Sequence, residues 1–321
     1  MTHPSDRQSR EPAADGGSPT SQSATIDSDS TAPPSTAAVD ETTDNSWQPP
    51  GLVDERIRQI RAVATTEYRL GIRSRWALAL TGLFTVFSLM ILTFSGSAVG
   101  PEGVERVVAS LMSLAIYLVP LAAVAFGYDM IVGRQQEGWL DIVFALPVTR
   151  ARVTLGSYIG RLIVLSGALS IGFGVAGILL LREFGVVYWN SFVVFLGATV
   201  ALGAVFLAIA LTVSTVAPTP THALGGVLGV WVWFVLIHDL LALGVVAAIS
   251  VPDWVLSVFV LVNPTSIFRL LVLGSLETTA SGGAAALDAS GLTPAVLVGA
   301  LGVWMLLPVG AAMGLISYRQ L

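Results

Sequence analysis

Six long apolar stretches, separated by short polar segments, make up most of the chain after residue 70. Each holds the ~20 apolar residues that a helix needs to cross the ~30 Å hydrocarbon core of a bilayer. Backbone polar groups inside lipid must bond within their own segment, so the pattern predicts an all-α polytopic membrane protein. The predicted spans lie near residues 76–95, 107–127, 156–181, 191–216, 223–250 and 294–317.

Two segments precede the first span, and their patterns differ. Residues 1–50 are acidic and rich in Ser, Thr, Pro and Gly, so they bury too little apolar surface to offset the entropy of ordering. They are predicted to be a disordered acidic tail. Residues 52–70 return to a helical pattern, with apolar side chains at Val53, Ile57, Ile60 and Ala64. This segment is predicted to be an amphipathic helix at the membrane interface, and an ordinary soluble helix is the alternative.

Arginine placement predicts the orientation of the spans. With the N-terminus in the cytoplasm, eleven arginines after residue 50 fall on the inner side of the membrane and three on the outer side. We therefore expect the N-terminus and the C-terminus of the chain to be cytoplasmic, and the protein to lie in the cytoplasmic membrane. The six-helix transmembrane domain is predicted to cover residues 76–321. The three outer arginines are Arg106, Arg182 and Arg269.

Composition narrows the possible functions. Hydrophobic residues make up 54% of the chain and charged residues 12%, with a mean hydropathy of +0.77. All 16 basic residues are arginine and there is no cysteine, which excludes a P-loop lysine and a cysteine nucleophile. No catalytic residue, metal-ligand spacing or nucleic-acid face is apparent. The chain is therefore not expected to be an enzyme or to bind a cofactor, and any ATP would be bound by a partner subunit.

The outer-face segment, 251–293, is apolar in places but too short to form an ordinary span. Asn263-Pro264 breaks it, and Thr265 or Ser266 is predicted to cap a second short helix that runs through Leu273. Small residues four apart recur in the spans and permit close helix approach, either within the chain or between two copies. These pairs are Gly156/Gly160, Ser170/Gly174, Gly225/Gly229 and Gly310/Gly314.

A distinctive cytoplasmic segment, 128–155, joins the second and third spans. Trp139, Leu140, Val143 and Phe144 form an apolar stripe, while Glu137 and Asp141 share another face and Pro147 ends the element. The pattern predicts a short amphipathic helix whose carboxylates face the cytoplasm and suit a docking partner. A charged loop anchored by arginines is an equally good interpretation of the spacing alone.

Two short runs in this segment resemble ABC-2-type permeases, particularly the NosY-like branch. They are the run from Gly133 to Asp141 (Gly-Arg-Gln-Gln-Glu-Gly-Trp-Leu-Asp) and the run from Ala145 to Arg150 (Ala-Leu-Pro-Val-Thr-Arg). Gly156, Tyr158, Gly160 and Arg161 also resemble the family's entry into the third span, and the resemblance covers about 52–321. The family often has an acid where this chain has Gln136.

The resemblance implies a permease subunit that exports a substrate while a separate ABC ATPase subunit hydrolyses ATP. It implies a homodimer or heterodimer of permease subunits in contact with membrane lipids, with no nucleic-acid partner. Segment 128–155 would contain the coupling helix, which docks in a groove of the ATPase. The residues given a coupling role are Arg134, Glu137, Gly138, Leu140, Asp141, Pro147 and Arg150.

His238 and Asp239 form an ionisable pair inside the fifth predicted span. Such a pair is costly at membrane depth and is by default a functional hypothesis. It supports one alternative function, a proton-linked secondary transporter. Two other interpretations are that the pair lies near the outer interface, or that Asp239 forms a structural hydrogen bond inside the bundle. The resemblance favours the structural interpretation. A membrane scaffold for the maturation of a copper enzyme is a further alternative implied by the resemblance.

Overall fold

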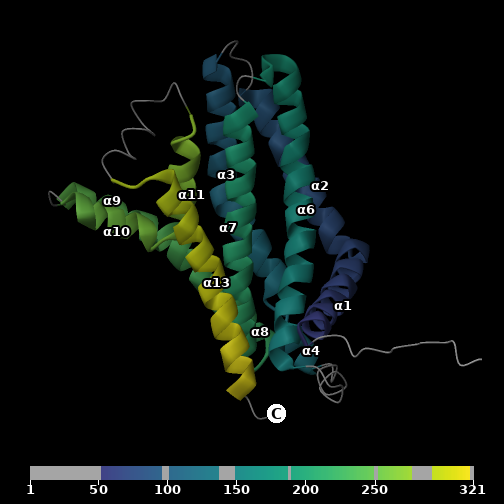
Figure 1. Ribbon diagram of the computed structural model, residues 1–321. Coiled ribbons are helices and arrows are strands. Elements are labelled where there is room, and N and C mark those ends of the chain that lie inside the picture. The colour runs from purple at the N-terminus through teal and green to yellow at the C-terminus, as the bar shows by residue number, and fades with distance from the viewer. Residues whose placement is uncertain are drawn as a thin grey trace, which may run out of the picture. The chain divides into compact units, whose positions relative to one another are not determined.

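The computed structural model describes residues 52–95, 101–136, 149–186, 189–248, 252–276 and 291–318, and those residues are almost entirely helical. The predicted acidic tail, 1–50, lies outside the described residues. The elements are α1 (Leu52–Arg73), α2 (Arg75–Ser95), α3 (Pro101–Gly127), α4 (Val132–Gln136), α6 (Arg150–Phe184), α7 (Trp189–Val216), α8 (Pro220–Val232), the π-helical turn η2 (Trp233–Ile237), α9 (His238–Ala248), α10 (Asp253–Leu261), α11 (Pro264–Leu273) and α13 (Pro294–Tyr318) (Figure 1).

Six helical stretches of the described chain are long and apolar enough to cross a membrane, and each overlaps one predicted span. The all-α polytopic fold is therefore confirmed. The stretches are Arg75–Phe94, Gly103–Gln136, Arg150–Phe184, Trp189–Val216, Pro220–Val245 and Pro294–Ser317.

Helix α7 is the centre of the bundle, with 67% of its most apolar window buried. It is apolar on all faces and packs against α3, α6, α11 and α13, as expected for a helix surrounded by others (Figure 1). Fully buried aromatic rings fill the space around it, and neighbouring rings lie 5.2–6.5 Å apart between centroids. The buried rings are Phe84, Phe173, Phe195, Phe206 and Phe268.

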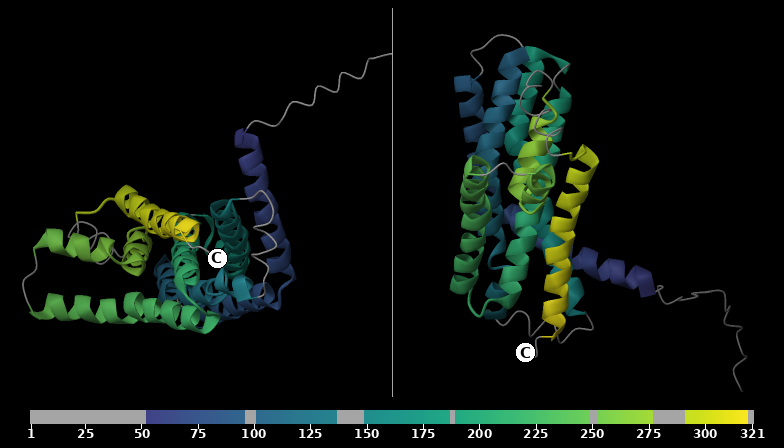
Figure 2. Two further views of the ribbon diagram at one scale, coloured as in Figure 1. Left: turned by 90° about the horizontal axis from the view of Figure 1, so that it is seen from below. Right: turned by 90° about the vertical axis from the view of Figure 1, so that its left-hand side faces the viewer.

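The outer helices α2 and α8–α9 have only 17% of their apolar windows buried. Helices α8, η2 and α9 follow one another as one rod that leads away from α7 (Figure 2). Large apolar side chains are exposed on these helices, including Phe94, Leu240 and Leu243. Faces of this kind are typical of contact with lipid or with another membrane chain.

Helix α6 is longer than a membrane is thick. Its 35 residues extend about 52 Å, while the 20 uncharged residues between Arg161 and Arg182 alone cover the ~30 Å of hydrocarbon. We infer that residues 150–161 project beyond the hydrocarbon. Helix α1 packs along this projecting part, and we call this end of the bundle the α1 end.

Glycines on α6 permit this packing. A Cβ atom at Gly160 would lie 2.3 Å from Glu67 Cβ, and one at Gly156 would lie 2.7 Å from Val63 Cβ. The pair Gly156/Gly160 therefore serves contact within the chain, one of the two predicted roles. A Cβ atom would meet nothing within 4 Å at five glycines in the other predicted pairs, which are Gly174, Gly225, Gly229, Gly310 and Gly314.

Helices α10 and α11 form a pair bent by 110°. The predicted cap of α11 at Thr265 or Ser266 is wrong, because the N-cap is Asn263, whose side chain accepts a hydrogen bond from the Thr265 backbone N–H at 2.9 Å. The helix starts earlier than predicted because Pro264 occupies its first turn, where a missing N–H costs nothing.

Candidate functional site

The residues predicted to dock the ATPase lie partly within the described chain. Arg134 lies in α4, and Arg150 is the first residue of α6. Glu137, Gly138, Leu140, Asp141 and Pro147 lie outside the described residues. The described structure therefore shows how the two ends of segment 137–148 are held.

Helix α4 is held from two sides before segment 137–148 begins. On one side, Ser214 at the end of α7 accepts hydrogen bonds from the backbone N–H groups of Ile131 and Val132, at 3.0 and 3.2 Å. On the other side, the Arg134 guanidinium forms an ion pair with Glu67 of α1 and donates to Ser157 Oγ of α6 at 3.1 Å. The start of the segment is thus tied to α1, α6 and α7.

Arg161 extends this contact into a cluster that links four parts of the chain. Its Nη1 lies 2.6 Å from Asp129 Oδ1, and its Nε lies 3.9 Å from Glu67 Oε2. It also donates to the Phe126 carbonyl and lies over the Phe126 ring. We call Glu67, Asp129, Arg134, Ser157 and Arg161 the ion cluster.

Glu67 is the centre of the ion cluster. It is only 5% exposed, and it lies on the face of α1 that packs on α6, three residues after the buried Ala64. Its carboxylate accepts from Ser157 Oγ at 3.5 Å in addition to contacting both arginines. Since a buried charge is tolerated when paired and hydrogen-bonded, the cluster holds α1 in one position against α6.

A cavity of about 250 Å³ lies beside the ion cluster. All four charged residues of the cluster line it, together with other residues that include Leu70, Trp76 and Tyr128. The cavity is large enough for several waters, so the charged groups have space to rearrange. A second contact, from Arg152 Nη1 to Gln59 Oε1 at 2.6 Å, joins α6 to α1 nearer the helix starts. The ion cluster and this hydrogen bond therefore join α1 to α6 at two points.

The structure places His238 and Asp239 in a second polar group, at the start of α9. Asp239 Oδ2 is paired with Arg269 Nη2 of α11 at 2.6 Å. His238 Nδ1 lies 2.8 Å from Asn263 Nδ2, and the His238 ring also has a hydrogen bond to the Phe259 backbone. Each ionisable side chain thus has partners within the protein.

Asn263 organises this second group because all of its polar atoms are used. Its Oδ1 accepts from both the N–H and the hydroxyl of Thr265, so its Nδ2 must donate to His238 Nδ1 and to the Phe234 carbonyl. The Phe234 carbonyl lies in the π-helical turn, and Thr265 Oγ1 lies 3.2 Å from it. A histidine that accepts at Nδ1 is neutral, which favours the structural interpretation over a proton relay.

Replacing Asn263 by alanine is expected to lower the thermal midpoint of unfolding in detergent. The change leaves His238 Nδ1 without its donor and weakens the α11 cap, at about 1–3 kcal/mol for each buried group left unsatisfied. Ser266→Ala on the same helical turn is the matched control. Equal midpoints for the two variants would show that the network does not hold α10 and α11 to η2.

Sequence reasoning missed Glu67, Asp129 and Ser157, and it noted Arg161 without a partner. One signal was present for Glu67, which is an acid on the apolar stripe of α1. Its partners lie far along the chain in α4 and α6, and no local pattern indicates them.

Comparison with known proteins finds matches that cover most of the chain. Residues 61–320 match the family described as ABC-2 family transporter protein. The chain is 36% identical over 264 residues to the "Probable ABC transporter permease protein NosY" of Pseudomonas aeruginosa, covering 79% of this chain and 94% of that protein. It is 37% identical over 235 residues to the protein of the same name from Stutzerimonas stutzeri, covering 70% and 85% of the two chains.

Proposed function

The chain belongs to the ABC-2 family of transporter proteins and is of the permease type, and we propose that it couples ATP hydrolysis by a separate subunit to substrate export across the cytoplasmic membrane. The observation that carries the proposal is the extent of the family match, which includes the six spans and segment 137–148. A chain without lysine has no P-loop lysine, so the ATPase would be another subunit.

Segment 137–148 would dock the ATPase through Glu137 and Asp141, with Gly138, Leu140 and Pro147 shaping the helix. Movement of the docked segment would pull on Arg134 at one end and Arg150 at the other. The ion cluster would pass that movement to α1, α3 and α6, which would shift between discrete packing arrangements as rigid elements.

The α1 end would face the cytoplasm, because ten of the arginines predicted to be inside lie there. The exposed apolar faces of α2 and α8–α9 would contact lipid and a second permease subunit. Loss of the His238 ring or of the Asp239 charge is not expected to abolish transport directly, because both residues are engaged in contacts that hold α10 and α11.

Purification of the full chain from its own membranes in mild detergent is expected to bring down a soluble ATPase subunit. The double variant Glu137→Ala with Asp141→Ala is expected to lose most of that partner, because it removes both proposed docking carboxylates. A matched control, Glu183→Ala with Asp253→Ala, removes two carboxylates away from segment 137–148 and should retain the partner.

Absence of any ATPase from an intact and abundant preparation would contradict the proposal. Retention of the ATPase by the Glu137/Asp141 variant would leave the permease assignment intact and refute the docking role of these two residues. ATPase binding without substrate flux would favour the scaffold alternative.

A further inference from the structure

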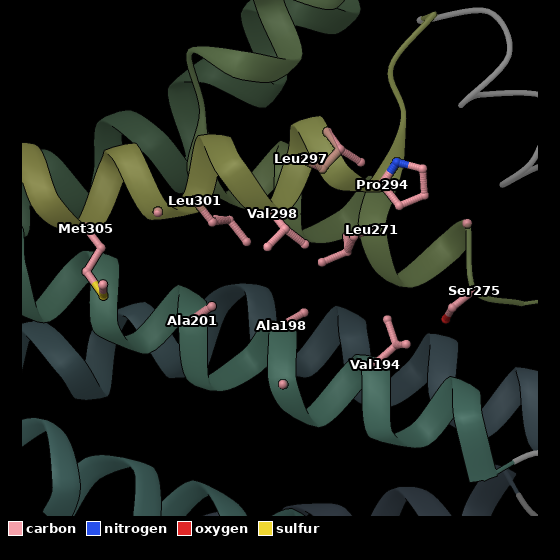
Figure 3. A pocket seen from close by; sticks show the side chains of 13 residues that line it. Val194, Ala198, Ala201, Leu271, Ser275, Pro294, Leu297, Val298, Leu301 and Met305 are labelled. Carbon is pink, nitrogen blue, oxygen red and sulfur yellow. The ribbon is translucent and has the colours of Figure 1, made fainter.

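A second cavity, of about 620 Å³, lies between α7, α11 and α13 (Figure 3). Apolar side chains from all three helices point into it, and none of the described residues that line it is charged. Its volume is typical of pockets that hold small molecules. The principal lining residues are Val194, Ala198, Leu271, Leu297, Leu301 and Met305.

Two glycines create much of this space. Gly197 of α7 and Gly302 of α13 both line the cavity, and a Cβ atom at either would meet nothing within 4 Å. No other atom therefore fills the space that the missing side chains leave at these two positions. Larger residues at these two positions would occupy it.

The cavity is elongated along α13. It extends along α13 from Pro294 to Met305, about 16 Å at 1.5 Å per residue, which is half of a ~30 Å hydrocarbon core. One end lies where α13 begins and α11 ends, beside Ser275. The other end lies near the middle of α13, beside Met305.

We propose that this cavity binds one acyl chain of a membrane phospholipid, with the head group near Ser275 and Pro294. An uncharged apolar lining one leaflet long matches the chemistry and the length of such a chain. A polar or charged ligand would lose its hydration there without gaining hydrogen bonds. The site is separate from the ion cluster and does not depend on how the chain is coupled to ATP.

The test uses the full chain in nanodiscs that contain a small fraction of phospholipid with a photoactivatable diazirine in its acyl chain. Cross-linked positions are then mapped by mass spectrometry. Leu301 and Met305 are expected to be labelled, and their labelling is expected to saturate at a low fraction of the probe lipid. The exposed Leu306 and Leu307 of α13 are expected to be labelled in proportion to the fraction of probe in the bulk lipid.

Two variants and one control make the result specific. Gly197→Leu and Gly302→Leu are each expected to lose the cavity label and to keep the label on Leu306 and Leu307. Gly299→Leu is the control, because Gly299 lies on α13 but does not line the cavity, and a Cβ atom there also meets nothing within 4 Å. This variant is expected to keep the label in the cavity and the label on Leu306 and Leu307. Thermal midpoints at or above that of the wild type would show that the filled variants are folded.

Two results would overturn the proposal. Label on Leu301 and Met305 that rises only in proportion to bulk lipid and survives both glycine substitutions would indicate annular lipid without a site. Complete absence of label from these residues would indicate that protein, not lipid, covers the cavity.

Discussion

Replacing Glu67 by glutamine is expected to destabilise the protein by about 3 kcal/mol, the order seen when one member of a buried ion pair is removed. The change leaves Arg134 and Arg161 without the carboxylate that both contact, and the remaining carboxylate of the cluster, Asp129, is partly exposed and paired with Arg161. The thermal midpoint of unfolding in detergent measures this loss. Glu55→Gln on the same helix, outside the ion cluster, is the matched control and should change little.

A double-mutant cycle identifies the interaction that is lost. If Glu67 stabilises the fold by neutralising Arg134, then Arg134→Gln should partly offset Glu67→Gln, and the two effects should not add. Strict additivity would mean that the Glu67–Arg134 pair contributes no interaction energy to stability.

The single variant Glu67→Gln also distinguishes docking of the proposed ATPase subunit from transmission of movement through the ion cluster. Glu67→Gln leaves the proposed docking residues Glu137 and Asp141 unchanged, so the proposed ATPase subunit is expected to co-purify with it as with the wild type. Loss of the ATPase from Glu67→Gln, with the chain folded, would argue that the ion cluster shapes the docking surface itself.

The spans were predictable from the sequence because the bilayer imposes a fixed length and internal backbone bonding on every crossing segment. Helix α6 illustrates the limit of this reasoning. Its apolar stretch marks the part within hydrocarbon, but the helix continues back to Arg150 because α1 supports its first turns by packing.

The polar sites were less predictable because their partners come from distant segments. Glu67 and Arg134 pair across the fold between α1 and α4, and Asn263 reaches back to Phe234 and His238. The π-helical turn that presents the Phe234 carbonyl has no simple signature in an apolar span. His238 and Asp239 were found as a pair in sequence, yet their structural partners appear only in the fold.

The contact between α1 and α6 is the element that joins these observations. Both the ion cluster and the Gln59–Arg152 hydrogen bond act across it. In the sequence, Arg134 lies three residues before segment 137–148 and Arg152 four residues after it. Close packing makes this contact stiff, since no side chain separates the two backbones at Gly160. A stiff contact transmits displacement, whereas a loose one absorbs it.

Replacing Gly160 by alanine is therefore expected to displace α1 from α6. The new Cβ atom would lie 2.3 Å from Glu67 Cβ and 2.7 Å from the Ala64 carbonyl oxygen, which is backbone and cannot rotate away. Overpacking alone costs about 1–3 kcal/mol, and displacement of Glu67 adds the loss of the ion cluster. The thermal midpoint should fall further than for Glu67→Gln.

The absence of cysteine from the chain permits a direct readout of this displacement. In the double variant Gln59→Cys with Arg152→Cys, a short bismaleimide is expected to cross-link the two positions, because the native side chains are in contact. Adding Gly160→Ala to this double variant is expected to reduce the yield of cross-link strongly. Gly167→Ala, where a Cβ atom on α6 meets nothing within 4 Å, should leave the cross-link unchanged. Equal cross-linking in both variants would mean that α1 accommodates the added methyl group by a small local shift. The close approach at Gly160 would then not be what fixes α1 in place.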